Sequence, residues 1–305
     1  MREELKYIAR KLFKLKIHES NGQTFEDLFS RVMSCSNKNF QQVKPQGRIG
    51  DKKNDGFDKV NGKYYQVYAP EDISSKEEKA IKKLETDFVG LKKYWDTLCP
   101  IKEFYFVIND KYRGAHPDVT TAILNLKNSY TKIKFDLFLS PQFEDCFLNL
   151  NDEDIIDIVG HIPEPESLTT LDFNILTEVI NYIIKNLKAF KSKEVILNPD
   201  FDKKIIFNNL SKGTSEFLNI GNYQVSSVDE FFKYNSNYTK QELRDRFKML
   251  YEEGKEKIGD DSDTIFYYIL NEANPFPEKK LPQDAVIVLM SYYFEACDIF
   301  EPPTK

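Results

Sequence analysis

The first forty residues repeat apolar side chains at helical spacing. In residues 2–16, Leu5, Ile8 and Leu12 belong to an apolar stripe that predicts an amphipathic helix. A second helical pattern, FEDLFSRVMS, follows Thr24, which we expect to be its N-cap. The sequence therefore predicts that the chain opens with two helices.

The next hundred residues alternate between strand and helix patterns. FDKV and KYYQVYA have strand chemistry, and Asn61–Gly62 between them predicts a hairpin turn. Ser74–Ser75 then open a charged helical pattern. After it come a strand, a helix and a last strand: KEFYFVIND, VTTAILNLKNSY and TKIKFDLFLS. Strands that alternate with helices predict an α/β (α+β) fold, a mixed sheet with flanking helices.

The second half of the chain is helical in pattern. Its helical segments are FNILTEVINYIIKNLKAF, YTKQELRDRFKMLYEEGKEKI, SDTIFYYILNEA and QDAVIVLMSYYFEACDIF. No strand pattern competes with them. We therefore expect two domains in these 305 residues, an α/β domain at 1–145 and a smaller all-α domain at 146–305.

Composition narrows the class of protein. Hydrophobic residues make up 41% and charged residues 30%, which is ordinary for a globular chain. No apolar run is long enough for a transmembrane helix, and the N-terminus lacks the apolar core of a secretory signal. The four cysteines form no C-x-x-C pair, so zinc and redox motifs have little support. We expect a cytoplasmic protein that does not bind membranes.

Charge divides the chain in the same way as the patterns do. Residues 1–145 carry 26 Lys and Arg against 21 Asp and Glu, whereas residues 146–305 carry 17 against 28. This asymmetry favours contact between a polyanion and the first half only, although unevenly distributed surface charge would give the same count.

The most informative segment runs from Gly47 to Gly56 and continues into the strand pattern after it. Asp55 lies on a turn that enters a hairpin, and strand alternation places Gln66 and Tyr68 on one face, with Tyr65 and Val67 pointing outward. Mg²⁺ and Mn²⁺ prefer such oxygen ligands, together with water and substrate phosphate. The alternative is a tight Asx-rich turn with no ligand.

These residues resemble the PD-(D/E)xK, restriction-endonuclease-like nucleases, in particular the Mrr-like branch with its Asp-Gly, hairpin and Gln-x-Lys. The resemblance implies that Asp55 is a metal ligand and that Gln66 fills the second motif position. It also implies metal-ligand roles for Asp51 and for Glu26 on an early helix. The implied activity is Mg²⁺-dependent (or Mn²⁺-dependent) phosphodiester hydrolysis of DNA or RNA, which many such enzymes perform as homodimers.

The third motif position departs from that family, because Tyr68 stands where the family has lysine. A lysine of the following helix can replace it. We expect Lys79 or Lys82 to do so, and Lys76 and Lys83 are also available. If none does, the chain is a catalytically inactive adaptor or sensor that binds nucleic acid or partner proteins.

Further cations are candidates for contact with the substrate. Lys52 and Lys53 lie beside the predicted metal site, and Lys111 and Arg113 follow a predicted strand, where α/β proteins place working residues. Tyr68 is included with them as a substrate-binding residue. A polar turn is the equal alternative for residues 109–114.

A wider resemblance covers nearly the whole chain. The segments KYYQVYAPED, FYFVINDKYRG, LNDEDIIDIVGHIPEP and SYYFEACDIFEPP look like proteins of ABC-three-component systems. The resemblance implies an effector in a bacterial antiviral or anti-plasmid system, with an ABC-type ATPase and a small middle component as partners. For the acidic, aromatic end around Phe294 and Phe300 we weigh a partner-binding surface against a docked terminal segment.

Overall fold

The computed structural model describes residues 1–44, 52–70, 77–164, 168–189, 200–235, 240–295 and 299–303. It divides into two compact units. One, the α/β unit, is Lys16–Ile158; the other, the helical unit, is Met1–Leu15 with Val159–Lys305. The division falls inside α1 (Glu3–Glu19) and inside α6 (Asp152–Val159). It therefore lies elsewhere than the predicted boundary at 145/146 and assigns most of α1 to the helical unit.

A mixed five-stranded sheet forms the centre of the α/β unit, as the sequence predicts. Its spatial order is the chain order, β1-β2-β3-β4-β5. The strands are β1 (Phe40–Gln42), β2 (Gly56–Asp58), β3 (Lys63–Tyr68), β4 (Glu103–Ile108) and β5 (Lys134–Phe138). β1, β2 and β3 pair antiparallel, whereas β3, β4 and β5 pair parallel. β1 was not predicted, because three residues carry too little pattern.

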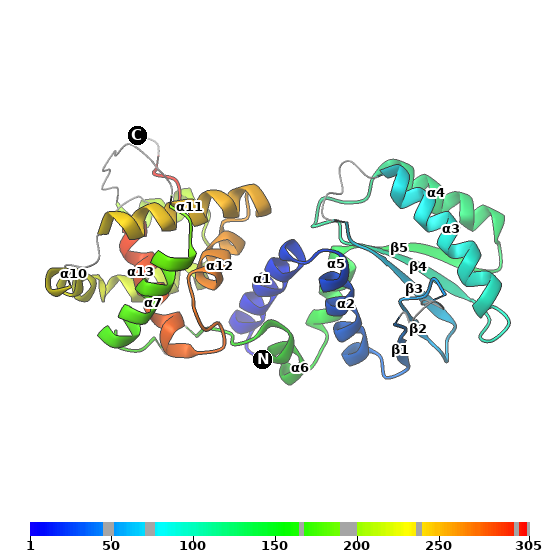
Figure 1. The fold of residues 1–305 in the computed structure, drawn as a ribbon, viewed down its shortest axis with the longest axis horizontal. Coiled ribbons are helices and arrows are strands. Elements are labelled where there is room, and N and C mark those ends of the chain that lie inside the picture. Colours follow the sequence, from blue (N-terminus) through cyan, green and yellow to red (C-terminus); the bar gives the residue numbers. More distant parts are fainter. Residues whose placement is uncertain are drawn as a thin grey trace. The chain divides into compact units, whose positions relative to one another are not determined.

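Helices cover both faces of this sheet (Figure 1). They are α3 (Glu77–Trp95) and α4 (Pro117–Ser129) on one face, and α2 (Gly22–Ser36) and α5 (Ser140–Leu148) on the other. Alternation correctly places Gln66 and Tyr68 on one face, the one under α3. Tyr65 and Val67 do point the other way, but they are buried, because α2 and α5 cover that face.

Two local details correct the sequence analysis. α2 begins one turn earlier than expected, with Asn21 rather than Thr24 as its N-cap. The Thr24 hydroxyl instead accepts a hydrogen bond from Asn21 N (3.0 Å) and donates one to Asn21 O (2.7 Å). The predicted hairpin forms between β2 and β3, and the serines expected to open α3 lie outside the described residues.

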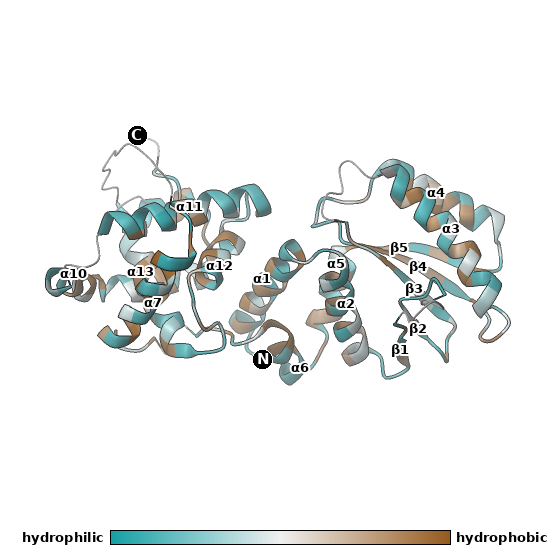
Figure 2. Cartoon of the chain, in the orientation of Figure 1, coloured by the Kyte–Doolittle hydropathy of each residue, from teal (hydrophilic) through white to brown (hydrophobic). Residues whose placement is uncertain are grey.

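The helical unit has α13 at its centre. Its other helices are α7 (Phe173–Asn186), α8 (Phe201–Phe207), α9 (Lys212–Asn222), α10 (Val225–Tyr234), α11 (Lys240–Ile258) and α12 (Ser262–Glu272). Every residue of α13 (Lys280–Glu295) from Pro282 to Ser291 is buried, as in a helix packed on all sides. α11 is mostly hydrophilic (Figure 2) and buries a single stripe. Among the described residues of this unit no strand occurs.

Polar contacts attach α1 to the helical unit. The Lys11 amine donates to both carboxylate oxygens of Asp261 (2.9 and 3.0 Å). The Tyr7 hydroxyl donates to Asp263 (2.5 Å), whose other oxygen accepts from Ser211 N (3.0 Å). Burial opposes the charge on Lys11, yet the hydrogen bond and charge of Asp261, together with Tyr7 and Asp263, outweigh it and raise the pKa of the amine. α1 is therefore an integral part of this unit.

The C-terminal segment is docked rather than presented to a partner. Phe294, Ile299 and Phe300 are buried. The buried amine of Lys204 donates to the carbonyl oxygens of Phe294 (2.6 Å) and Ile299 (2.7 Å). These apolar side chains therefore do not form a partner-binding surface. No helix in the described part of the chain is long and apolar enough to span a membrane.

Candidate functional site

Asp55 lies just before β2, beside the carboxyl half of β3. The last register pair of the hairpin is Gly56 with Tyr65, so Asp55 comes next to Gln66. The backbone holds it from both sides, because Asp55 N donates to Tyr65 O (3.3 Å) and Asp55 O accepts from Val43 N (3.1 Å). The structure therefore brings together the first two predicted motif residues.

The side chain of Asp55 is buried and held by two hydrogen bonds. Its Oδ2 atom accepts from Gln66 Nε2 (2.6 Å) and from Val67 N (2.6 Å). A buried carboxylate that accepts bonds from a backbone N–H and a side-chain amide is fixed in orientation. Asp55 is 5% exposed and Gln66 is 2% exposed, so the pair lies just beneath the surface.

Polar atoms without partners occur on Gln66 itself and on Asn54, the residue before Asp55. Among the described residues, Gln66 Oε1 has no hydrogen-bond partner, and neither does the amide oxygen or nitrogen of Asn54, which is fully buried. A buried polar atom left unpaired costs roughly 1–3 kcal/mol. Three such atoms beside one carboxylate are typical of a place that a ligand, ion or water completes.

The remaining predicted metal ligands are Glu26 and Asp51. Glu26 is half-buried on α2, one turn beyond Gly22, whose N–H donates to Ala69 O (2.6 Å) next to the end of β3. Asp51 lies outside the described residues. Within the described part of the chain, no group of three or more His, Cys, Asp or Glu is arranged to hold a metal ion.

Tyr68 occupies the position of the family's lysine without replacing its charge. Its ring is half-buried and stacks on Phe106, with 5.9 Å between the ring centroids. Burial raises the pKa of the Tyr68 hydroxyl, so the side chain stays neutral at physiological pH. Tyr68 therefore supplies neither a cation nor an anion near Asp55.

The lysines of α3 differ in their positions. Lys82 is exposed and lies opposite the buried stripe of Ala80 and Leu84, so it points away from the sheet. Lys79, also exposed, lies nearer to that stripe, and neither lysine forms an ion pair with a described residue. The amine of Lys83 is bound to the buried carboxylate of Asp87 (2.7 Å), and Lys76 lies outside the described residues.

Lys52 and Lys53 are anchored along α3. Lys53 Nζ lies 2.9 Å from Asp87 Oδ1, and the stem of Lys53 packs against Gly90. Lys52 Nζ lies 5.4 Å from the centre of the Tyr94 ring. Both lysines have positive φ (54° and 64°), a conformation that L-residues rarely adopt. Their contacts with α3 hold the turn that carries Asn54 and Asp55.

The turn after β4 is built on two buried side chains. Asn109 Nδ2 donates to Ile17 O (3.0 Å) and Ser20 O (2.8 Å), and Asp110 accepts from Ser140 N (2.8 Å) and Gly114 N (2.9 Å). Lys111 is half-buried, and burial followed by repulsion from Arg113 lowers the pKa of its amine. Arg113 is exposed.

The side chains around Asp55 fit a hard divalent cation. Mg²⁺ and Mn²⁺ bind oxygen, and proteins commonly supply one or two carboxylates, with water and substrate phosphate completing the shell. Here the Asp55 carboxylate is bonded to the amide of Gln66, and buried Asn54 precedes it in the chain; each amide has an oxygen without a partner among the described residues. This set of candidate ligands has one carboxylate and two neutral amide oxygens, so it differs from a site built from several acidic residues.

Sequence reasoning missed Asn54 and Asp87. Asn54 was considered only as part of a turn, and turn residues are normally exposed, whereas this one is fully buried. Asp87 is a buried carboxylate in the middle of a charged helix pattern, and its residue type alone does not distinguish it from the exposed Glu85. An acidic residue on the apolar stripe of an amphipathic helix was the available signal.

The helical unit gives the match with known proteins. A single matched region contains α8 to α13, the docked segment at Ile299–Glu301 and all of α7 except its first residue, Phe173. Residues 174–301 match C-terminal domain 10 of the ABC-three component (ABC-3C) systems. The CTD10 match covers less than half of the chain and lies wholly within the helical unit. No curated protein and no solved structure matches the chain.

α1 lies outside the CTD10 match, although its Lys11 is bound to Asp261 inside that match. The α/β unit is also outside the match. CTD10 in this chain is thus accompanied by an N-terminal helix that packs with it and by a separate α/β unit.

Proposed function

We propose that the chain is the effector of an ABC-three-component conflict system and that its α/β unit is a metal-dependent nuclease acting on DNA. The observation that carries the proposal is the buried Asp55–Gln66 pair with unpaired amide atoms beside it. The CTD10 match supports the system. The ABC-type ATPase and the small middle component are the partners that we propose for the chain.

Asp55 holds the cation in this proposal, and Gln66 and Asn54 provide oxygen atoms around it. These residues would hold Mg²⁺ or Mn²⁺, which would supply polarisation of the scissile phosphate and a lowered pKa for a water molecule. Asp55 is kept in place by the Gln66 and Val67 donors. Glu26 and Asp51 remain proposed ligands.

A lysine of α3 stabilises negative charge on the phosphate. We propose Lys79 rather than Lys82, because Lys82 lies opposite the buried side of the helix. The two lysines form a matched pair on one helix. Lys79→Ala is expected to slow cleavage by about tenfold or more, and Lys82→Ala by less than about twofold. Equal effects would remove Lys79 from the mechanism.

Plasmid nicking with Mg²⁺ or Mn²⁺ tests the activity, alone and with the ATPase and middle component. Wild type is compared with Asp55→Ala and with Asp136→Ala, a matched change of an exposed aspartate on β5. We expect metal-dependent nicking that Asp55→Ala abolishes and Asp136→Ala keeps. Nicking that survives Asp55→Ala would contradict the proposal. RNA under the same conditions identifies the preferred polymer.

The neutral, half-buried Tyr68 favours a second candidate, an inactive nuclease-fold adaptor. An adaptor would bind nucleic acid or the partner proteins and show no cleavage in any combination of partner and metal. Nicking that the partner proteins switch on would exclude it. Binding of DNA by wild type, without cleavage in the complete system, would establish it.

A further inference from the structure

A hollow of about 540 Å³ lies at the amino ends of β3 and β4. It is formed where the β2–β3 turn meets the segment that precedes β4. Gly62 in that turn has φ +66°, and a Cβ atom there would lie 2.5 Å from Pro100 O, so only glycine permits this close approach. Gly62 is four residues from Gln66, roughly 13 Å along an extended strand. The hollow is thus separate from the Asp55 site.

The accessible lining of this hollow is aliphatic. Val60 is 62% exposed and Leu98 is 65% exposed, and Pro100 lies beside them. Trp95 also lines the hollow, but its ring packs against Phe57 and Tyr94, with centroids 5.1 and 5.3 Å away. The exposed side chains therefore suit aliphatic groups better than they suit stacking on a planar base.

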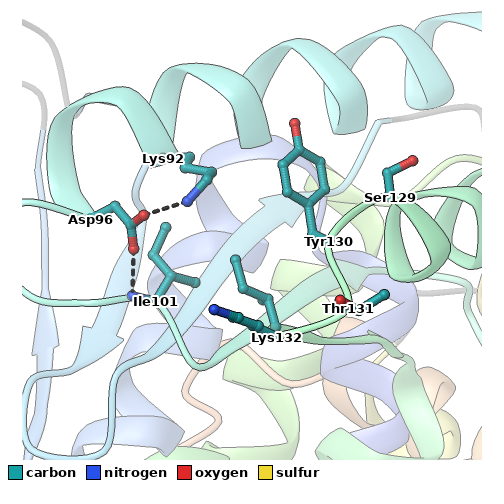
Figure 3. A pocket seen from close by; sticks show the side chains of 8 residues that line it. Lys92, Asp96, Ile101, Ser129, Tyr130, Thr131 and Lys132 are labelled. Atoms are coloured by element: carbon teal, nitrogen blue, oxygen red, sulfur yellow. Dashed lines mark hydrogen bonds and ion pairs between the residues drawn. The ribbon is translucent and has the colours of Figure 1, made fainter.

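The charged lining is cationic. Lys59 and Lys102 are the charged side chains among the described residues of the hollow, and neither has an ion-pair partner in the described part of the chain. A neighbouring hollow of about 410 Å³ adds Lys132 (Figure 3). In Figure 3 Lys92 is bound to Asp96, which also accepts from Ile101 N (3.0 Å), whereas Lys132 makes no such contact.

We propose that this basic aliphatic groove, formed by Val60, Leu98 and Pro100 with Lys59 and Lys102, binds a segment of a partner protein that carries aliphatic and acidic side chains. Aliphatic side chains of the segment cover Val60 and Leu98, and its carboxylates pair with the two lysines. The exposed aliphatic side chains of the groove are complementary to aliphatic side chains of the segment, and its lysines are complementary to carboxylates.

Nucleic acid fits the groove less well. Phosphates could pair with the lysines, but bases bind proteins by stacking on exposed ring faces. The aromatic ring here is packed against its neighbours, and Val60 and Leu98 would then face a polar backbone. The choice of an acidic, aliphatic peptide rests on that difference.

A random dodecapeptide phage library, panned on the full chain, tests the proposal. We expect enrichment of sequences that combine aspartate or glutamate with leucine, isoleucine or valine. A labelled consensus peptide then gives a Kd by fluorescence anisotropy. Trp95 is the single tryptophan, so its emission reports occupation of the groove directly.

Three variants complete the test. Leu98→Asp and Lys102→Glu are expected to weaken peptide binding by about tenfold or more. Leu124→Asp changes a leucine on α4 that is 51% exposed and outside the groove, and it should leave the Kd within about twofold. Circular dichroism confirms that each variant is folded.

Three results would each overturn the proposal: no enrichment of acidic and aliphatic sequences, a Kd unchanged by Leu98→Asp, or constant Trp95 emission when the peptide is saturating. Displacement of the peptide by a single-stranded oligonucleotide in wild type, with direct quenching of Trp95, would assign the groove to nucleic acid instead.

Discussion

Two buried aspartates stand at opposite ends of β2 and have opposite surroundings. Asp58, at the turn end, accepts four hydrogen bonds, from the backbone N–H groups of Val60 and Asn61 and from the side-chain amides of Asn37 and Asn61. Asp55, at the other end, accepts from Gln66 Nε2 and Val67 N on its Oδ2 atom, while Gln66 Oε1 and the amide of the buried Asn54 have no partner among the described residues. Burial and residue type are the same, so only the partners distinguish them.

The difference separates a carboxylate that completes a turn from the one that we propose as a metal ligand. Burial alone would raise the pKa of Asp58, but the hydrogen bonds outweigh it and lower the pKa to about 2. The carboxylate of Asp58 thus has its hydrogen bonds supplied by the turn itself, and a bound ligand would not stabilise it further. Next to Asp55, the amide oxygens of Gln66 and Asn54 have no partner among the described residues, and an added cation would satisfy them.

The largest expected effect separates the two aspartates by activity. Asp55→Asn should slow nicking by about a hundredfold or more, because it removes the charge that holds the metal, while the amide oxygen still accepts from Val67 N. Asp58→Asn should keep the rate, per folded molecule, within about threefold. Initial rates of supercoil loss measure both. Equal losses in the two variants would erase the proposed distinction.

Stability should show the reverse order. Asp58→Asn places an NH₂ group against donors that now bond to a carboxylate, and should lower the free energy of unfolding by about 2–3 kcal/mol. Asp55→Asn should lower it by less than about 1 kcal/mol. Urea unfolding followed by circular dichroism measures the two values. A smaller loss in Asp58→Asn than in Asp55→Asn would contradict the comparison.

Acid sharpens the same contrast. The pKa of Asp58 is about 2 in the folded chain and 3.8 as the reference value, so its charge stabilises the fold by about 2 kcal/mol above the reference pKa. That contribution is lost as the pH falls from about 5 through 2. The difference in unfolding free energy between wild type and Asp58→Asn should therefore shrink between pH 5 and pH 3. A constant difference would show that Asp58 is not the group responsible.

The smallest effect concerns metal binding without catalysis. Gln66→Glu places a second carboxylate beside Asp55, so Mg²⁺ or Ca²⁺ should stabilise this variant by about 1 kcal/mol more than wild type. Without metal the two carboxylates repel, and the variant should melt lower. Thermal melts with and without the ion measure both, and Gln23→Glu, an exposed change on α2, is the control. If the ion changes the melting temperature equally in wild type and in both variants, the proposal that Asp55 binds a cation is contradicted.

Strong local patterns predicted the α/β fold. Features that depend on short segments or on distant contacts, such as β1 and the place of α1, were not predicted. β3 and β4 follow from dense runs of aromatic and branched residues. β1 has three residues and forms because β2 pairs with it. The place of α1 in the helical unit depends on Asp261, which is 250 residues from Lys11, and no local pattern carries that information.

In the candidate site, too, local features could be predicted and features that depend on packing could not. The turn and strand patterns placed Asp55 beside Gln66, because a hairpin fixes register over a few residues. Turn propensity says nothing about burial, so the enclosed position of Asn54 could not be predicted. The α3 lysines were equivalent in sequence, and only the packing of the helix separates Lys82 and Lys79 from Lys83, which is bound to Asp87.

The contact between α1 and α12 also means that α1 is synthesised long before the residues that it binds. At roughly 5–20 residues per second, the 250 residues between Lys11 and Asp261 take on the order of 10–50 s to emerge. The whole α/β unit leaves the ribosome within that interval and can fold. Through it Lys11 and Tyr7 of α1 are without Asp261 and Asp263, their partners in the finished chain. We therefore expect the newborn protein to depend on chaperones during that interval, and on how quickly its last third is translated.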